Sequence, residues 1–186
     1  MSTDAGSSGT PTGSAPVTDT SALDRERRDL LESLRRHRWF LLHTVEGLTR
    51  DQATDRPTVS ELSLGGLVKH VAATERQWAR FIAEGPQAMA SAEGSTDWAS
   101  GFRLLPEETL EEVLAHYGEV ARQTDDLVTS LPDLDADHPL PEAPWFEAGA
   151  RWSARRVFLH IIAETAQHAG HADILRETVD GQKTMG

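Results

Sequence analysis

Apolar residues recur along most of the chain at intervals of three and four, which places them on one face of an α-helix. Four segments show this spacing, and no stretch of useful length alternates apolar and polar residues as a half-buried strand would. The pattern therefore predicts an all-α protein. Its clearest stripe joins Leu110, Val113, Leu114, Tyr117, Val120, Ala121, Thr124, Leu127 and Val128.

Capping residues indicate where the four helices begin and end. Ser21, Ser63 and Ser153 are suited to cap helix N-termini, Pro106 is suited to a first turn, and Gly85 is suited to a helix end. The expected helices cover about 21–47, 63–85, 106–130 and 153–179. The last of these ends before Asp180-Gly181.

The chain has 186 residues, which is enough for one domain with a substantial core. Residues 1–20 consist largely of Ser, Thr, Gly, Pro and Asp, a composition typical of a flexible tail. We therefore expect a tail over 1–20 and a helical domain over 21–186.

Charge and composition exclude several function classes. The formal net charge is −12, so electrostatic binding to nucleic acid or to an anionic membrane surface is not expected. No apolar run is long enough for a membrane span, and no signal peptide is visible, so we expect a cytoplasmic protein. Since the chain has no cysteine, any metal site must use His and carboxylate ligands.

The segment 160–177 carries the candidate chemistry. On a helical wheel, Glu164 and His168 point with the apolar stripe of the last helix, one turn apart, so that two side chains could hold one ion. A buried carboxylate needs a partner, and a metal-free Glu164–His168 pair is the alternative. Glu112 and His116 share the spacing but point away from their stripe, as solvated surface residues do.

A third ligand could come from the second helix, where His70 lies at the edge of the apolar stripe. The alternative for His70 is a boundary histidine that serves the core. Glu75, at the other edge, could support a ligand or form a surface ion pair.

The two later connections are long for a helical domain, and long loops are often functional. They contain four aromatic residues, which could line an apolar pocket or simply pin the loops to the core. These are Trp98, Trp145, Phe146 and Trp152.

Two motifs stand out, residues 63–75 (SLGGLVKHVAATE) and residues 164–171 (ETAQHAGH). The first resembles the start of helix two in the DinB-like superfamily, in particular its DUF664 branch, and the second resembles the last-helix ligand motif of that family. The resemblance covers about 23–181. It implies a four-helix bundle with an up-down-down-up course and a long crossover connection.

The resemblance also implies one divalent metal ion, held by His70, Glu164 and His168. Many relatives have a histidine at the position of Glu164. The mycothiol-dependent maleylpyruvate isomerase branch has a glutamate there, as this chain does. Two His and one carboxylate suit Zn²⁺, with Ni²⁺, Fe²⁺ and Mn²⁺ as alternatives. Three protein ligands leave a coordination position for water or substrate, which is typical of catalytic sites.

Similar proteins are metal-dependent transferases or isomerases that use a low-molecular-weight thiol such as mycothiol or bacillithiol as cosubstrate. We hypothesise that the metal binds and deprotonates the thiol, and that the thiolate attacks an electrophile held against the loop aromatics. His171 and His160 are the candidates for proton transfer. Alternatively, each of these histidines lies at the boundary of the core or supports a metal ligand without transferring a proton.

A non-catalytic metal-binding or stress-response protein is the competing interpretation, because a fold does not determine an activity. Relatives often form homodimers, so a homodimer is a further expectation. A di-iron site is not favoured, because the stripes of the first and third helices contain no Glu-x-x-His set.

Overall fold

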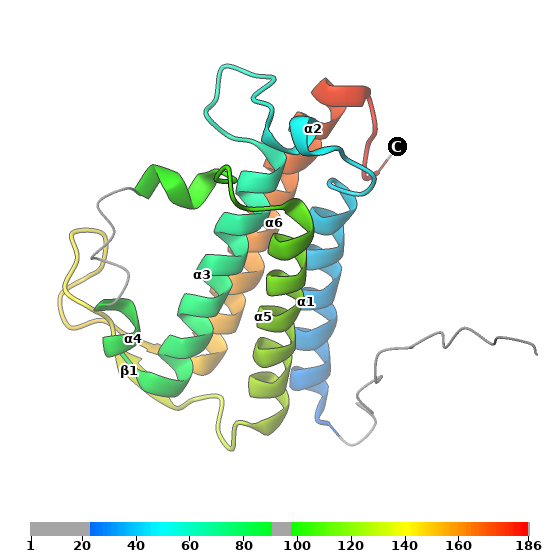
Figure 1. Cartoon of the computed structure of the whole chain (residues 1–186). Coiled ribbons are helices and arrows are strands. Elements are labelled where there is room, and N and C mark those ends of the chain that lie inside the picture. Colours follow the sequence, from blue (N-terminus) through cyan, green and yellow to red (C-terminus); the bar gives the residue numbers. More distant parts are fainter. Residues whose placement is uncertain (1–22, 91–97, 186) are drawn as a thin grey trace, which may run out of the picture.

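The structure, a computed structural model, describes residues 23–90 and 98–185. Within these ranges four long helices lie side by side (Figure 1). They are α1 (Arg25–His43), α3 (Leu64–Glu84), α5 (Leu110–Ser130) and α6 (Ala154–Asp180). The connections contain α2 (Arg50–Thr54), α4 (Gln87–Ala90), the 3₁₀-helix η1 (Trp98–Phe102), β1 (Asp137–Pro139) and β2 (Arg151–Ser153). The mostly helical architecture confirms the all-α class.

The predicted ends of α3 and α6 are confirmed. Ser63 and Ser153 are extended in backbone, and their side chains accept hydrogen bonds from backbone N–H groups in the first turn of α3 and α6. Gly85 and Gly181 follow the last helical residues at positive φ, 82° and 81°, where a residue with a Cβ would be strained.

The predicted start of the third helix is wrong, because α5 begins four residues after Pro106. Thr109 accepts a hydrogen bond from the backbone N–H of Glu112, and the Glu112 side chain accepts one from the N–H of Thr109. This reciprocal capping box satisfies two N–H groups that the first turn cannot pair. The Thr-x-x-Glu pattern, and not the proline, therefore marks the start of α5.

The first helix is also shorter than predicted. Asp24 caps α1 by accepting from the N–H of Arg27, and the helix ends at His43 instead of Gly47. The expected cap, Ser21, and the expected tail over 1–20 lie outside the described residues.

Two short strands were not predicted. Strands β1 and β2 pair antiparallel, with Asp137 opposite Ser153, and β2 leads directly into α6. Three residues per strand are too few to produce a recognisable alternation in the sequence.

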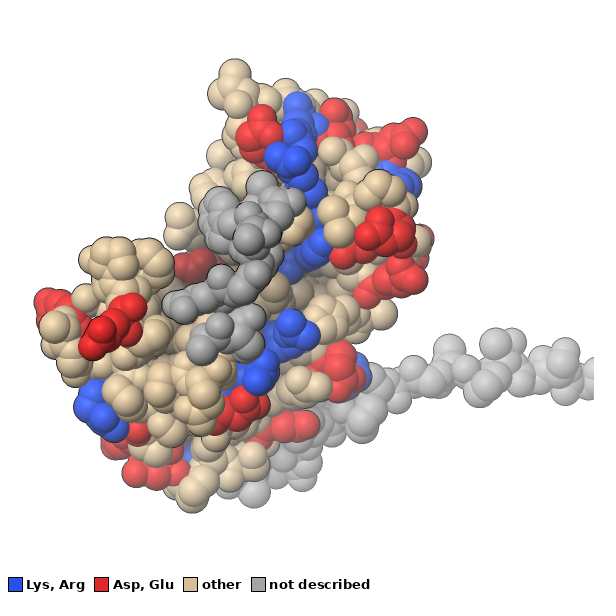
Figure 2. Space-filling view, turned by 60° about the vertical axis from the view of Figure 1, so that its left-hand side comes forward, with Lys and Arg blue, Asp and Glu red and all other residues tan. Residues whose placement is uncertain are grey.

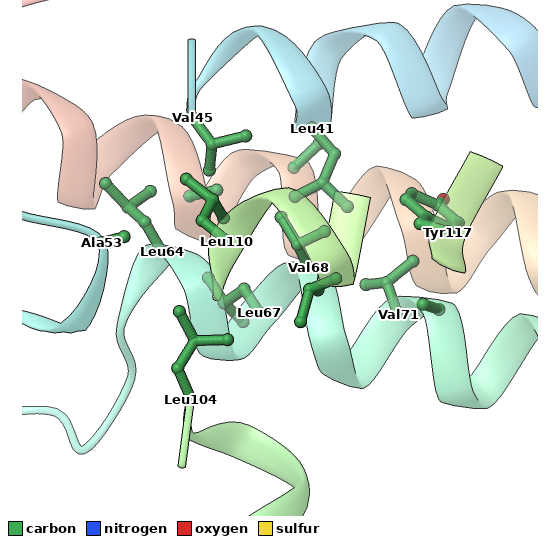
Figure 3. Close-up of a cluster of buried hydrophobic side chains, with 14 of the residues drawn as sticks. Leu41, Val45, Ala53, Leu64, Leu67, Val68, Val71, Leu104, Leu110 and Tyr117 are labelled. Atoms are coloured by element: carbon green, nitrogen blue, oxygen red, sulfur yellow. The ribbon is translucent and has the colours of Figure 1, made fainter. Parts of the chain in front are cut away.

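The core consists of two clusters of buried apolar side chains. One lies toward the N-terminal end of α3 and contains Leu67, Val71 and Tyr117 (Figure 3). The other lies toward the C-terminal end of α3 and contains Trp78 and Phe81.

A layer of buried polar residues lies between these clusters, with one residue from each long helix. They are Arg38, Glu75, Thr124 and Thr165. Arg38 donates two hydrogen bonds to Glu75, at 2.5 and 3.2 Å, and one to Asp125 at 2.7 Å. The surface ion pair considered for Glu75 is therefore wrong, because its side chain is only 1% exposed.

None of the helices in the described part of the chain carries an apolar stretch long enough to cross a bilayer. On the face seen in Figure 2, several Lys and Arg side chains line up down the middle, and acidic side chains lie on both sides of them.

Candidate metal centre

Helices α3 and α6 bring together the three side chains named for a metal site. One ligand atom each from His70, Glu164 and His168 lies within 4.8 Å of the other two, and all three residues are half-buried. Donor atoms around a tetrahedral zinc ion are about 3.4 Å apart, given bonds of about 2.0–2.1 Å. Modest side-chain rotations would therefore close the set around one ion.

The α6 side of the site is a ladder of residues spaced by four. Along it, Nε2 of His160 lies 3.9 Å from one carboxylate oxygen of Glu164, and Nε2 of His168 lies 3.7 Å from the other. A spacing of four stacks these side chains along one side of the helix. Glu164 therefore lies between two imidazoles.

The expectation that Glu164 points into the core is wrong. Its side chain is 29% exposed, and the neighbouring Thr165 is buried in its place. The buried face of α6 is centred on Ile161, Thr165 and Ala172. This face lies farther from Glu164 around the helix than the helical wheel predicts. A position at the edge of the core keeps the carboxylate within reach of a ligand from solvent.

His70 is held between two rings. It stacks on Phe102 with centroids 3.9 Å apart and meets His168 edge to face at 4.9 Å. Burial, and secondarily the charge of His168, lowers the pKa of His70 to about 4. The ring is therefore neutral at physiological pH, and a neutral imidazole is the form that binds a metal.

Phe102 is a site residue that the sequence analysis missed. The connection before α5 crosses the start of α3 so closely that a Cβ on Gly66 would overlap the carbonyl oxygen of Phe102. Lys69 donates to the carbonyl of Arg103 at 3.1 Å and pairs with Glu108 at 2.7 Å, which ties the connection to α3. The two glycines at the start of α3 were the available signal, since glycine in a helix is costly unless a backbone passes nearby.

His171 contacts the ligand candidate His168, and the Nδ1 atoms of the two rings are 3.4 Å apart. This contact leaves Nε2 of His168 facing Glu164. Burial, and secondarily His171, lowers the pKa of His168. The pKa of His160 is also lowered, by burial and by the charge of Arg156, against the opposing effect of Glu164.

Aromatic side chains continue the site beyond His160. Trp152 stacks on Trp78, with ring centroids 4.8 Å apart. The His160 ring lies edge-on to both, with its centroid 5.1 Å from that of Trp152 and 4.7 Å from that of Trp78. The Phe146 ring meets the Trp152 ring edge to face, with centroids 5.8 Å apart. Trp152 therefore pins β2 to α3, as one of the two interpretations predicts, and its ring also borders His160.

The other two loop tryptophans differ. Trp145 is 76% exposed and contributes no wall to the site. The side chain of Trp98 lies outside what the structure describes. Glu112 and His116, the pair with the same spacing on the third helix, are both exposed, as expected of surface residues.

The donor set fits a divalent cation. Two neutral imidazoles and one carboxylate carry a single negative charge, and within the described ranges no Lys or Arg forms an ion pair with Glu164. Nitrogen and oxygen donors of this kind suit zinc and the neighbouring transition metals.

Comparison with known protein families identifies the relatives of the chain. The sequence model of the mycothiol-S-transferase family matches residues 29–181, so the chain belongs to this family. This is a DinB-like family, so the resemblance noted from the two motifs is confirmed. No curated protein matches the chain.

Proposed function

We propose that this member of the mycothiol-S-transferase family joins mycothiol to a small electrophile, using a divalent metal held by His70, Glu164 and His168. The observation that carries the proposal is the convergence of these three donors at one edge of the α3–α6 seam. The family assignment supports the thiol as cosubstrate. The absence of cysteine means that the sulfur nucleophile must come from a second molecule.

The reaction forms a carbon–sulfur bond and releases the thiol proton. A divalent metal at this site would lower the pKa of the thiol, since the thiolate is the nucleophile. We propose that His171 accepts the proton, which then passes to solvent or to the leaving group. In an addition without a leaving group, the same proton would go to the adjacent carbon of the acceptor.

The remaining residues act on orientation. We propose that His160 holds Glu164 through the contact between Nε2 and the carboxylate and so keeps the carboxylate turned toward His70. Phe102 holds the His70 ring from the other side and limits the access of water. Zn²⁺ is the proposed metal, because two imidazoles and one carboxylate recur in zinc sites with an open position.

The test uses protein purified without a polyhistidine tag, in which bound metal is measured first. Mycothiol and monochlorobimane are then added, and the fluorescent conjugate is followed. We expect stoichiometric metal and a conjugation rate well above that of the metal-free protein. Stoichiometric metal without conjugation of any electrophile tried would overturn the transferase proposal and favour the non-catalytic metal-binding alternative.

A cobalt-substituted sample tests the thiol itself. Sulfur ligation adds charge-transfer bands to the visible spectrum, so mycothiol should change the absorption whereas its S-methyl derivative should not. An unchanged spectrum with mycothiol, bacillithiol and glutathione would remove the thiol from the proposal.

The role of His171 is tested separately. His171→Ala should retain metal and lose most of the conjugation rate, because the proton acceptor is gone. Loss of metal in this variant would instead make His171 a positioning residue for His168, which its Nδ1 contacts.

We propose that the reaction takes place in the cytoplasm, where small thiols are kept reduced. We also propose that the protein forms a homodimer. For the fold, we propose the up-down-down-up course of DinB-like bundles. The contact of η1 with α3 supports this course, because the connection that leaves the end of α3 returns along that helix before α5 begins.

A further inference from the structure

The ladder on α6 continues past the candidate metal ligands to a cation. Arg156 lies four residues before His160, which lies four residues before Glu164. The Arg156 guanidinium lies over the Trp152 ring, 4.2 Å from its centroid. Trp152 is the same ring that meets His160 edge to face.

Arg156 differs from Arg155 and Arg151, the two nearest arginines in the sequence. Arg155 pairs with Glu26 and Asp135, and Arg151 pairs with Asp137 at 2.6 Å. Arg156 is exposed, and across the described ranges no carboxylate lies within ion-pair distance of it. In a chain of net charge −12, an unpaired cation beside the site is a local exception to a field that repels anions.

The aromatic contact gives this cation a defined place. A guanidinium stacked on an indole keeps its edge free, and that edge is the part that binds a carboxylate through two parallel hydrogen bonds. The helix rises about 1.5 Å per residue, so eight residues separate Arg156 from Glu164 by about 12 Å along the axis. His160 lies between them along the helix, and its ring contacts both stacked tryptophans.

We propose that Arg156 selects the acceptor: the preferred electrophile carries a carboxylate or similar anionic group on the order of 10 Å from its reacting carbon. This inference rests on the proposed transferase function. An acceptor of this length would place its reacting carbon at the metal ligands, its body along His160 and Trp152, and its anionic end at the guanidinium.

The test compares two ligands that differ only in one charge. Mycothiol is coupled without enzyme to 6-maleimidohexanoic acid or to its methyl ester, and each conjugate is titrated calorimetrically into the zinc-loaded protein. The six-carbon chain places the carboxylate at the required distance from the sulfur-bearing ring. We expect the acid to bind about fivefold tighter than the ester, and the preference to shrink at high salt.

Three variants locate the effect. Arg156→Gln should reduce the preference to about one while leaving ester binding and melting temperature unchanged. Arg156→Lys should retain part of the preference, since the charge remains without the planar fork. Arg36→Gln, at an exposed arginine of α1 with no ion-pair partner among the described residues, should keep the full preference.

The outcomes separate this inference from the function on which it rests. Equal binding of acid and ester to the unmodified protein, or a preference that survives Arg156→Gln, overturns the role of Arg156 alone. Failure of both conjugates to bind overturns the role and the proposed function together.

Discussion

Two groups of ionisable side chains in this protein differ in how their charges are balanced. In the buried polar layer, Arg38 is surrounded by the carboxylates of Glu75 and Asp125. At the edge of the α3–α6 seam, Glu164 faces two imidazoles and no Lys or Arg within the described residues. The first group satisfies its own charges, because Arg35 also pairs with Asp125, at 3.1 Å. The second, the edge group of His70, Glu164 and His168, is left with one negative charge and with imidazole nitrogens that can bind a metal.

The pKa shifts express this difference. Burial lowers the pKa of Arg38, but Glu75 and Asp125 outweigh burial and raise it above its usual value. Burial also lowers the pKa of His70, and the neighbouring His168 lowers it further. A charged side chain in the layer is therefore stabilised by its neighbours, while the edge group favours neutral rings that an external cation can bind.

Breaking the buried layer should have the largest effect. Arg38→Met leaves the Glu75 carboxylate buried without its cation, and we expect the free energy of unfolding to fall by about 3–5 kcal/mol. Glu164→Gln in metal-free protein should change it by less than about 1 kcal/mol, because the side chain is half-buried and has no cation to lose. Urea denaturation of both variants measures the two changes.

A paired substitution provides the control for this prediction. Arg38→Met combined with Glu75→Leu should recover most of the loss, since the stranded charge is removed as well. Equal costs for Arg38→Met and Glu164→Gln would contradict the distinction between a self-satisfied layer and an open edge.

Adding metal should act on the edge group alone. Zinc at about 100 times its dissociation constant should stabilise the metal-free protein by about 2.7 kcal/mol, because it binds only the folded state. Replacing His70, Glu164 or His168 by Ala should abolish this gain, measured as a shift in melting temperature. His116→Ala, at an exposed histidine of α5, should retain it.

The metal-free pair of Glu164 and His168 predicts a different result. In that case zinc and chelators would leave the melting temperature unchanged, and His70→Ala would matter little. This outcome would remove the proposed metal centre and leave the fold as described.

Moving the connection that carries Phe102 should have an intermediate effect. Gly66→Ala places a Cβ against the carbonyl of Phe102, so the connection must shift, and we expect a loss of about 1–3 kcal/mol. Zinc affinity should also fall, because the ring stacked on His70 moves with its backbone. Urea denaturation and zinc titration measure the two effects.

Gly118→Ala is the matched control, since this helical glycine of α5 has only the end of Arg122 nearby, at 3.9 Å. It should stabilise the protein by about 0.5–1 kcal/mol, as alanine does in an unobstructed helix. A gain of similar size for Gly66→Ala would show that the close approach at Phe102 is unimportant.

Local signals in the sequence predicted the parts of the fold that depend on neighbours along the chain. The serine caps of α3 and α6 act within one helical turn, and the spacing of Glu164 and His168 lies within one helix. His70 could be named from its place at the edge of a stripe and from the family motif. The structure brings its ligand atom within 4.8 Å of the other two.

Long-range packing decided the features that the sequence could not predict. Glu75 looks like a surface residue until α1 places Arg38 against it. Phe102 reaches His70 only because a connection folds back over α3, which no periodicity encodes. Thr165, not Glu164, faces the core, because the rotation of α6 is set by its contacts with α1 and α3.

The smallest effect is expected outside both groups, at the ion pair that fastens the connection to α3. Burial raises the pKa of Glu108, but the N–H of Leu105 and the Lys69 ammonium outweigh it, so the pKa lies below its usual value. A carboxyl whose pKa is lower in the folded state stabilises the protein at pH values above its unfolded-state pKa of about 4.3. This contribution is lost as the pH falls through the folded-state pKa. Glu108→Gln should therefore cost less than about 1 kcal/mol at pH 7.

The same cost should shrink in acid. Urea denaturation of the wild type and Glu108→Gln at pH 7 and again near pH 3 should show a gap in unfolding free energy that narrows at the lower pH, as protonation of the wild-type carboxyl increases. Zinc affinity at pH 7 should fall slightly in the variant, because Phe102 is held less firmly against His70. A gap of the same size at both pH values would mean that Glu108 acts through its shape, and that the connection over the edge group does not depend on its charge.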